Sequence, residues 1–191
     1  MKILLTGDSI LARHEEFDEP AINHFLSQKF PQAKLINTAY PGLNSGGLCV
    51  SANKRILQPE KCDYLVILIG TNDLATHKQV PLEQFKANLQ FLVSSIIWRY
   101  SPKRVIFVSP PAVDETKQEV RSNTLVEKYS QVIIEVCDQY QLTHIDLFKA
   151  MLEHGNLPEL CHGLKNDGLH FGEAGYLLLS DLLATAIEKT L

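Results

Sequence analysis

The segment Tyr64-Leu65-Val66-Ile67-Leu68-Ile69 is apolar at every position. A strand with one face in water alternates apolar and polar residues, whereas an unbroken apolar run of this length is typical of a strand buried on both faces. Central strands of parallel sheets are buried in this way, because helices cover both faces of such sheets. This segment therefore predicts the centre of a parallel sheet.

The rest of the chain alternates short apolar runs with longer amphipathic runs. Strands are predicted over residues 2–6, 34–38, 64–69, 104–109 and 143–147. Helices are predicted over about 17–29, 47–57, 81–100, 119–140 and 176–187, where apolar residues recur at spacings of three and four. The chain shows no internal repeat and no linker. We therefore expect one α/β domain over residues 1–191, a three-layer α/β/α sandwich around a five-stranded parallel sheet.

Charge and composition exclude several classes of function. The formal net charge is −4 and lysines and arginines do not cluster, so we expect no nucleic-acid partner and no binding to anionic membranes. No apolar run approaches the ~18 residues of a membrane-spanning helix. The first predicted strand begins at residue 2 and leaves no room for a signal peptide. We expect a cytoplasmic protein with buried, reduced cysteines at positions 49, 62, 137 and 161.

Polar, turn-forming segments follow the first three predicted strands. They are Gly7-Asp8-Ser9, residues 39–42 and Gly70-Thr71-Asn72-Asp73. In open parallel sheets, ligands bind beyond the carboxyl ends of the strands. We therefore expect these three segments to meet at one edge of the sheet.

A serine at that edge can act as a nucleophile only if a base removes its proton and an acid orients the base. Of the seven histidines, His170 alone lies in a turn-rich segment with a carboxylate nearby, Asp167, three residues before it. By themselves, these residues are also compatible with a simpler interpretation. In that interpretation Ser9 is an ordinary turn residue and His170 merely precedes the closing helix.

Acyl transfer also needs hydrogen-bond donors for the oxyanion that develops during the reaction. Gly42 is a candidate backbone donor, and Asn72 is a candidate side-chain donor that follows the buried strand. Alternatively, Gly42 is a plain turn residue after Pro41, and Asn72 caps a helix. We interpret the carboxylates of Asp8 and Asp73 as acceptors that stabilise turns, and not as proton carriers.

Taken together, the polar segments resemble the GDSL, or SGNH, esterase/lipase family, whose four sequence blocks carry Ser, Gly, Asn and His. The matching segments are G-D-S-I at 7–10, residues 37–42, G-T-N-D at 70–73 and D-G-L-H at 167–170. Isoleucine at position 10 replaces the usual leucine. The α/β-hydrolase motif G-x-S-x-G is absent, so that superfamily fits less well.

The resemblance implies a flavodoxin-like SGNH-hydrolase fold and ester hydrolysis through an acyl-enzyme. Ser9 would be the nucleophile, His170 the general base and Asp167 its orienting acid. The Ser9 N–H, the Gly42 N–H and the Asn72 side chain would form the oxyanion hole. We expect no cofactor and no metal, because the adjacent Cys161 and His162 lack the matching partners that a zinc site needs.

Residues 80–89 further resemble the branch that contains isoamyl acetate-hydrolysing esterases and small bacterial acylhydrolases. We expect a small-molecule acyl ester as the substrate, with a short acyl chain, because the predicted loops are short and include no long apolar lid. His77 is a candidate substrate contact. The alternatives are a carbohydrate O-acetylesterase and a non-catalytic, flavodoxin-like binding domain; the latter would lack activity on a chromogenic ester.

Overall fold

A five-stranded, all-parallel sheet lies at the centre of the computed structural model, which describes residues 1–190. Its strands run in the order β2-β1-β3-β4-β5, the order typical of flavodoxin-like folds. The strands are β1 (Lys2–Gly7), β2 (Lys34–Asn37), β3 (Tyr64–Leu68), β4 (Val105–Val108) and β5 (Thr143–Ile145). All residues of β3 are buried, and β1 and β4 flank it. The apolar segment thus forms the centre of the sheet, as predicted.

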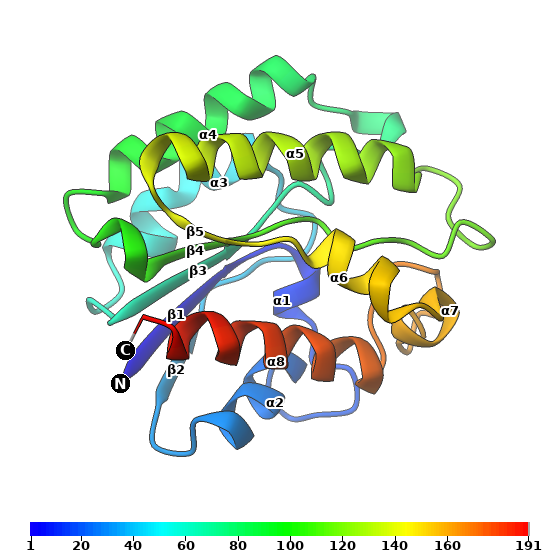
Figure 1. Ribbon diagram of the computed structural model, residues 1–191, viewed down its shortest axis with the longest axis horizontal. Helices are drawn as coiled ribbons and strands as arrows, with labels where there is room; N and C mark the ends of the chain where they lie inside the picture. Colours follow the sequence, from blue (N-terminus) through cyan, green and yellow to red (C-terminus); the bar gives the residue numbers. More distant parts are fainter. Residues whose placement is uncertain (191) are drawn as a thin grey trace.

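Helices cover both faces of this sheet. They are α1 (Ser9–Ala12), α2 (Ala21–Lys29), α3 (Ser45–Ala52), α4 (Leu82–Ile96), α5 (Asn123–Tyr140), α6 (Leu147–His154), α7 (Leu157–Leu160) and α8 (Glu173–Glu188). Three further helical segments are the π-helical η1 (Asn53–Leu57) and the 3₁₀-helical η2 (Thr76–Lys78) and η3 (Pro102–Arg104). Figure 1 shows α3, α4 and α5 on one side of the sheet and α2 and α8 on the other. The predicted three-layer α/β/α sandwich is therefore confirmed.

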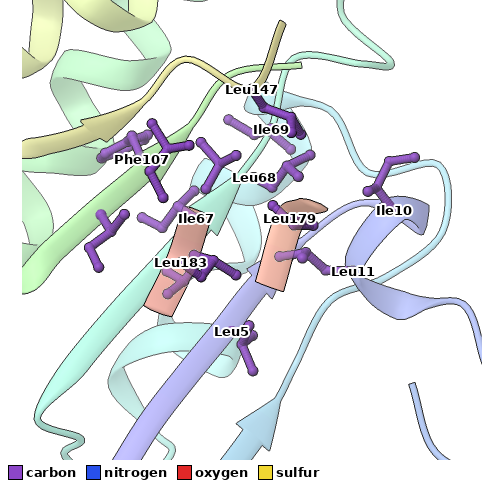
Figure 2. Packing of buried hydrophobic residues seen from close by; sticks show 14 of the residues in the cluster. Leu5, Ile10, Leu11, Ile67, Leu68, Ile69, Phe107, Leu147, Leu179 and Leu183 are labelled. Atoms are coloured by element: carbon purple, nitrogen blue, oxygen red, sulfur yellow. The ribbon is translucent and has the colours of Figure 1, made fainter. Parts of the chain in front are cut away.

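The long helices bury the apolar faces that their sequences predict. Helix α4 buries Phe85, Leu89, Leu92 and Ile96, and α8 buries Tyr176, Leu179, Leu183 and Ile187. Figure 2 shows Leu179 and Leu183 of α8 among the buried side chains of the core. Each such side chain stabilises the fold by about 1.5–3 kcal/mol through burial. The packed layers hold the strand ends, and the loops that follow them, in fixed positions.

Two helices begin later than predicted. Helix α2 starts after Pro20 and not at residue 17. Helix α5 starts at Asn123 and not near residue 119, because the Ser122 side chain accepts a hydrogen bond from the Leu125 N–H and caps the helix there. Residues 119–122 consequently belong to the loop after β4, at the carboxyl edge of the sheet.

Three short helices, α1, α6 and α7, were not predicted. Helix α6 begins directly after Asp146, whose side chain accepts a hydrogen bond from the Lys149 N–H at 3.0 Å. This cap ends β5 at Ile145, two residues before the predicted end. Segments of four to eight residues are too short to display a helical period clearly, so the sequence does not reveal these three helices.

The four cysteines are free thiols, as expected. Cys62, Cys137 and Cys161 are buried, and Cys49 is half-buried. Within residues 1–190, none of the helices has both the length and the apolar character needed to cross a bilayer.

Candidate active site

Ser9 lies at the carboxyl end of β1, where the chain turns from strand to helix. Gly7 precedes this turn with a φ of +151°, and a Cβ atom on it would lie 2.1 Å from the Leu68 carbonyl oxygen, so a larger residue does not fit. The Asp8 side chain accepts a hydrogen bond from the Ile10 N–H at 2.9 Å and caps α1. As the first residue of that helix, Ser9 has an N–H without an intrahelical acceptor.

His170 reaches Ser9 from the other end of the chain, 161 residues away. The Ser9 Oγ and the His170 Nε2 are 2.9 Å apart, and the His170 Nδ1 is 2.8 Å from the Asp167 Oδ2. The second oxygen of Asp167 accepts hydrogen bonds from the backbone N–H groups of His170 and Leu169 at 3.0 and 3.1 Å. This arrangement can move a proton from the serine to the imidazole.

The environment of these residues favours a neutral imidazole beside an ionised carboxylate. His170 is only 7% exposed, and burial lowers its pKa, although the hydrogen bond to Asp167 opposes that effect. Burial alone would raise the pKa of Asp167, but its hydrogen bonds from His170 and Leu169 outweigh burial and lower the pKa. At neutral pH His170 can therefore accept a proton.

Two further loops bring Gly42 and Asn72 to the same edge of the sheet. The Tyr40 N–H donates to the Gly7 carbonyl at 2.8 Å, and the Asn72 Nδ2 donates to the Leu43 carbonyl at 3.0 Å. Gly42 has a φ of +80°, and no atom lies within 4 Å of where a Cβ would stand. The Asn72 amide has two hydrogens on Nδ2, so one remains after the bond to Leu43. These loops can offer donors to an oxyanion.

The carboxylates of Asp8 and Asp73 act as acceptors within the buried framework of the site. Asp73 accepts hydrogen bonds from the N–H and the hydroxyl of Ser45, the first residue of α3. Burial raises the pKa of Asp73, and it raises the pKa of Asp8 to about 6. Both side chains are fully buried, so neither is placed to exchange protons with a substrate.

Gln118 and Arg121 connect the loop of the histidine to the loop of Asn72, and the sequence analysis did not identify either residue. The Arg121 Nε donates to the Thr71 carbonyl at 2.8 Å, and its Nη1 donates to the Gln118 Oε1 at 3.2 Å. The Gln118 Nε2 in turn donates to the Asp167 carbonyl at 2.6 Å. The one sequence signal for this contact is Ser122, because a serine that caps the helix at this position leaves Gln118 and Arg121 in the preceding loop.

Two further expectations concern His77 as a substrate contact and possible metal ligands. His77 is exposed on η2, next to Lys78. In the part of the chain that the structure describes, no group of three or more His, Cys, Asp or Glu side chains could hold a metal ion.

Comparisons with known proteins match this chain to lipases, acylhydrolases and esterases. Residues 5–178 match the GDSL-like Lipase/Acylhydrolase family. A GDSL esterase/lipase of Arabidopsis thaliana is 24% identical over 98% of this chain and 79% of its own length. The isoamyl acetate-hydrolyzing esterase of Saccharomyces cerevisiae is 29% identical over 64% of this chain and 55% of its own length. A lipase/acylhydrolase structure from Enterococcus faecalis superposes with a TM-score of 0.88 at 30% identity, covering 100% of this chain and 96% of the other.

Proposed function

Because the chain belongs to the GDSL-like lipase/acylhydrolase family and is a carboxylic ester hydrolase, we propose that Ser9, His170 and Asp167 form its catalytic triad. The observation that carries this proposal is the pair of contacts on His170, 2.9 Å to the Ser9 Oγ and 2.8 Å to the Asp167 Oδ2. A nucleophile, a base and an orienting acid in hydrogen-bond contact are what acyl transfer through a serine requires.

In the proposed mechanism, the His170 Nε2 takes the hydroxyl proton as the Ser9 Oγ attacks the ester carbonyl. The tetrahedral oxyanion accepts hydrogen bonds from the Ser9 N–H, the Gly42 N–H and the Asn72 Nδ2. His170 then gives its proton to the departing alcohol, which leaves an acyl group on Ser9. A water molecule, activated by the same imidazole, releases the acid. Asp167 keeps the His170 Nδ1 protonated, so that Nε2 faces the serine.

We propose that the substrates are short acyl esters, from acetyl to butyryl. The loops that carry the site expose two large apolar side chains, Tyr40 at 58% and Leu164 at 62%. These two side chains offer little apolar surface to a long fatty chain, which gains binding energy only where an extended apolar groove removes it from water. The name of the yeast relative, an isoamyl acetate-hydrolyzing esterase, agrees with a short acyl group.

A series of p-nitrophenyl esters tests this preference. The expected result is a higher kcat/KM for the acetyl and butyryl esters than for the palmitoyl ester, measured below the concentration at which the long ester aggregates. An acetylated oligosaccharide in the same series tests the alternative of a carbohydrate O-acetylesterase. Faster turnover of the palmitoyl ester would contradict the proposal.

The proposed base, His170, should also determine how kcat/KM depends on pH. Only neutral imidazole can accept the serine proton, so kcat/KM should fall as the pH drops through the pKa of His170. Because burial lowers that pKa from its ordinary value of 6.5, the midpoint of the fall should lie below pH 6.5. Above it, the rate should reach a plateau. The measurement is kcat/KM between pH 5 and 9.

Asp8 needs a control in this experiment, because its pKa of about 6 lies in the same range. The variant Asp8→Asn keeps an acceptor oxygen for the Ile10 N–H but removes the ionisation. If His170 controls the rate, the acid limb persists in this variant. A profile that rises towards pH 5, or an acid limb that disappears with Asp8→Asn, would remove His170 from the proposed role.

A further inference from the structure

The Asn72 side chain is held at both of its polar atoms. Its Nδ2 donates to the Leu43 carbonyl at 3.0 Å, and its Oδ1 accepts a hydrogen bond from the Lys78 Nζ at 3.2 Å. A lysine ammonium has three donors and no acceptor, and a carbonyl oxygen accepts only. The two partners therefore favour the same orientation of the amide. In the opposite orientation, the amide N–H groups would face the ammonium and the amide oxygen would face the Leu43 carbonyl oxygen.

We propose that Lys78 is a positioning residue of the oxyanion hole, which orients and polarises the Asn72 amide for the transition state. This inference rests on the proposed role of Asn72 as an oxyanion donor. With Oδ1 bound by the ammonium and one Nδ2 hydrogen bound by Leu43, the second Nδ2 hydrogen has a fixed direction. Fixed donors stabilise a developing charge without having to reorganise during the reaction.

The backbone around Lys78 is anchored well enough for such a role. Lys78 is the last residue of η2, and its N–H donates to the Ala75 carbonyl at 2.9 Å. The Val80 N–H donates to the Asp73 carbonyl at 2.8 Å, which closes the loop onto the residue after Asn72. The Thr76 N–H donates to the carbonyl of residue 120 at 2.9 Å and ties this loop to the one after β4. The backbone of Lys78 is thus held in place, and the ammonium reaches Asn72 from a fixed position.

The charge of the ammonium adds to its geometric effect. Hydrogen bonds from an ionised donor are stronger than neutral ones, and bonds in series polarise one another. An ammonium on Oδ1 draws electron density from the amide nitrogen and makes its remaining hydrogen a better donor.

The test compares Lys78→Met and Lys78→Arg with the unchanged protein on one acetyl ester. Methionine keeps most of the side-chain length without the charge, whereas arginine keeps a charged donor. Lys78→Met should lower kcat by about tenfold, less than the loss of a whole donor, and should leave KM unchanged. Lys78→Arg should recover most of that loss. Lys103→Met removes an exposed lysine on η3, before β4, and should leave both constants unchanged.

A second comparison places Lys78→Met in an Asn72→Ala background. If Lys78 acts through the amide, it should have no effect on kcat once the amide is gone. An equal loss in both backgrounds, or a rise in KM alone, would mean that Lys78 contacts the substrate directly and would overturn the inference. An unchanged kcat for Lys78→Met would also overturn it while leaving the triad untouched. A full kcat for Asn72→Ala alone would instead remove the proposed oxyanion role, and this inference with it.

Discussion

Ser9→Ala and His170→Ala are each expected to lose on the order of 10⁴ to 10⁶ in kcat, and the double variant is expected to be scarcely worse than either. In the proposed triad, Ser9 needs His170 to remove its proton across the 2.9 Å contact, and His170 has nothing to activate when the hydroxyl is absent. Residues that act as one unit in this way give strongly non-additive losses. The measurement is kcat for all three variants on one acetyl ester.

Two further observations strengthen this experiment. An organophosphonate ester should label Ser9 and should fail to label Ser9→Ala. Ser94→Ala and His154→Ala, which change exposed residues on α4 and α6, should keep full activity and labelling. Losses that add on a logarithmic scale, or phosphonylation of another residue, would show that the triad assignment is wrong.

Asn72→Ala is expected to fold and to lose on the order of 10² to 10³ in kcat, the usual cost of one oxyanion donor. KM should change little, because the donor serves the transition state more than the bound ester. The side chain also bonds to the Leu43 carbonyl, so a modest loss of stability should accompany the change. Steady-state kinetics and thermal unfolding of the same preparation separate the two effects.

Asn23→Ala is the matched control. Asn23 is as buried as Asn72, at 7% and 6% exposure, and its Oδ1 accepts a hydrogen bond from Asn37 at 2.9 Å. It lies on α2 and should lose stability without losing kcat. If Asn72→Ala behaves in the same way as this control, Asn72 has a structural role only and is not an oxyanion donor.

The strands could be predicted closely because their signal is local. The all-apolar run at 64–69 and the shorter runs at 2–6 and 34–38 each end within one residue of the observed strand. The same local signal placed the segments with Ser9, Gly42 and Asn72 after parallel strands, and so at one edge of the sheet. The family match over residues 5–178 confirms the resemblance that these segments indicated.

The contacts between loops could not be predicted, because they depend on how distant segments pack. Nothing in the sequence around Lys78 indicates that its ammonium reaches Asn72, six residues earlier. Arg121 lay inside a predicted helix, and only the cap at Ser122 shows that it belongs to a loop and can reach the Thr71 carbonyl. Side chains that join two loops carry no periodic pattern, so only three-dimensional structure reveals them.

The separation of Ser9 and His170 along the chain also matters for biosynthesis. Ser9 follows β1, whereas His170 comes just before α8, so that all the other strands are translated between them. The segments of β1 to β4, and the loops that carry Gly42 and Asn72, are thus all translated before the proposed base. A premature stop codon after α7 would likewise yield a polypeptide that contains the segments of all five strands but lacks His170, the proposed base. Esterase activity should therefore appear only after the segment that carries the proposed base has been translated and has folded against Ser9.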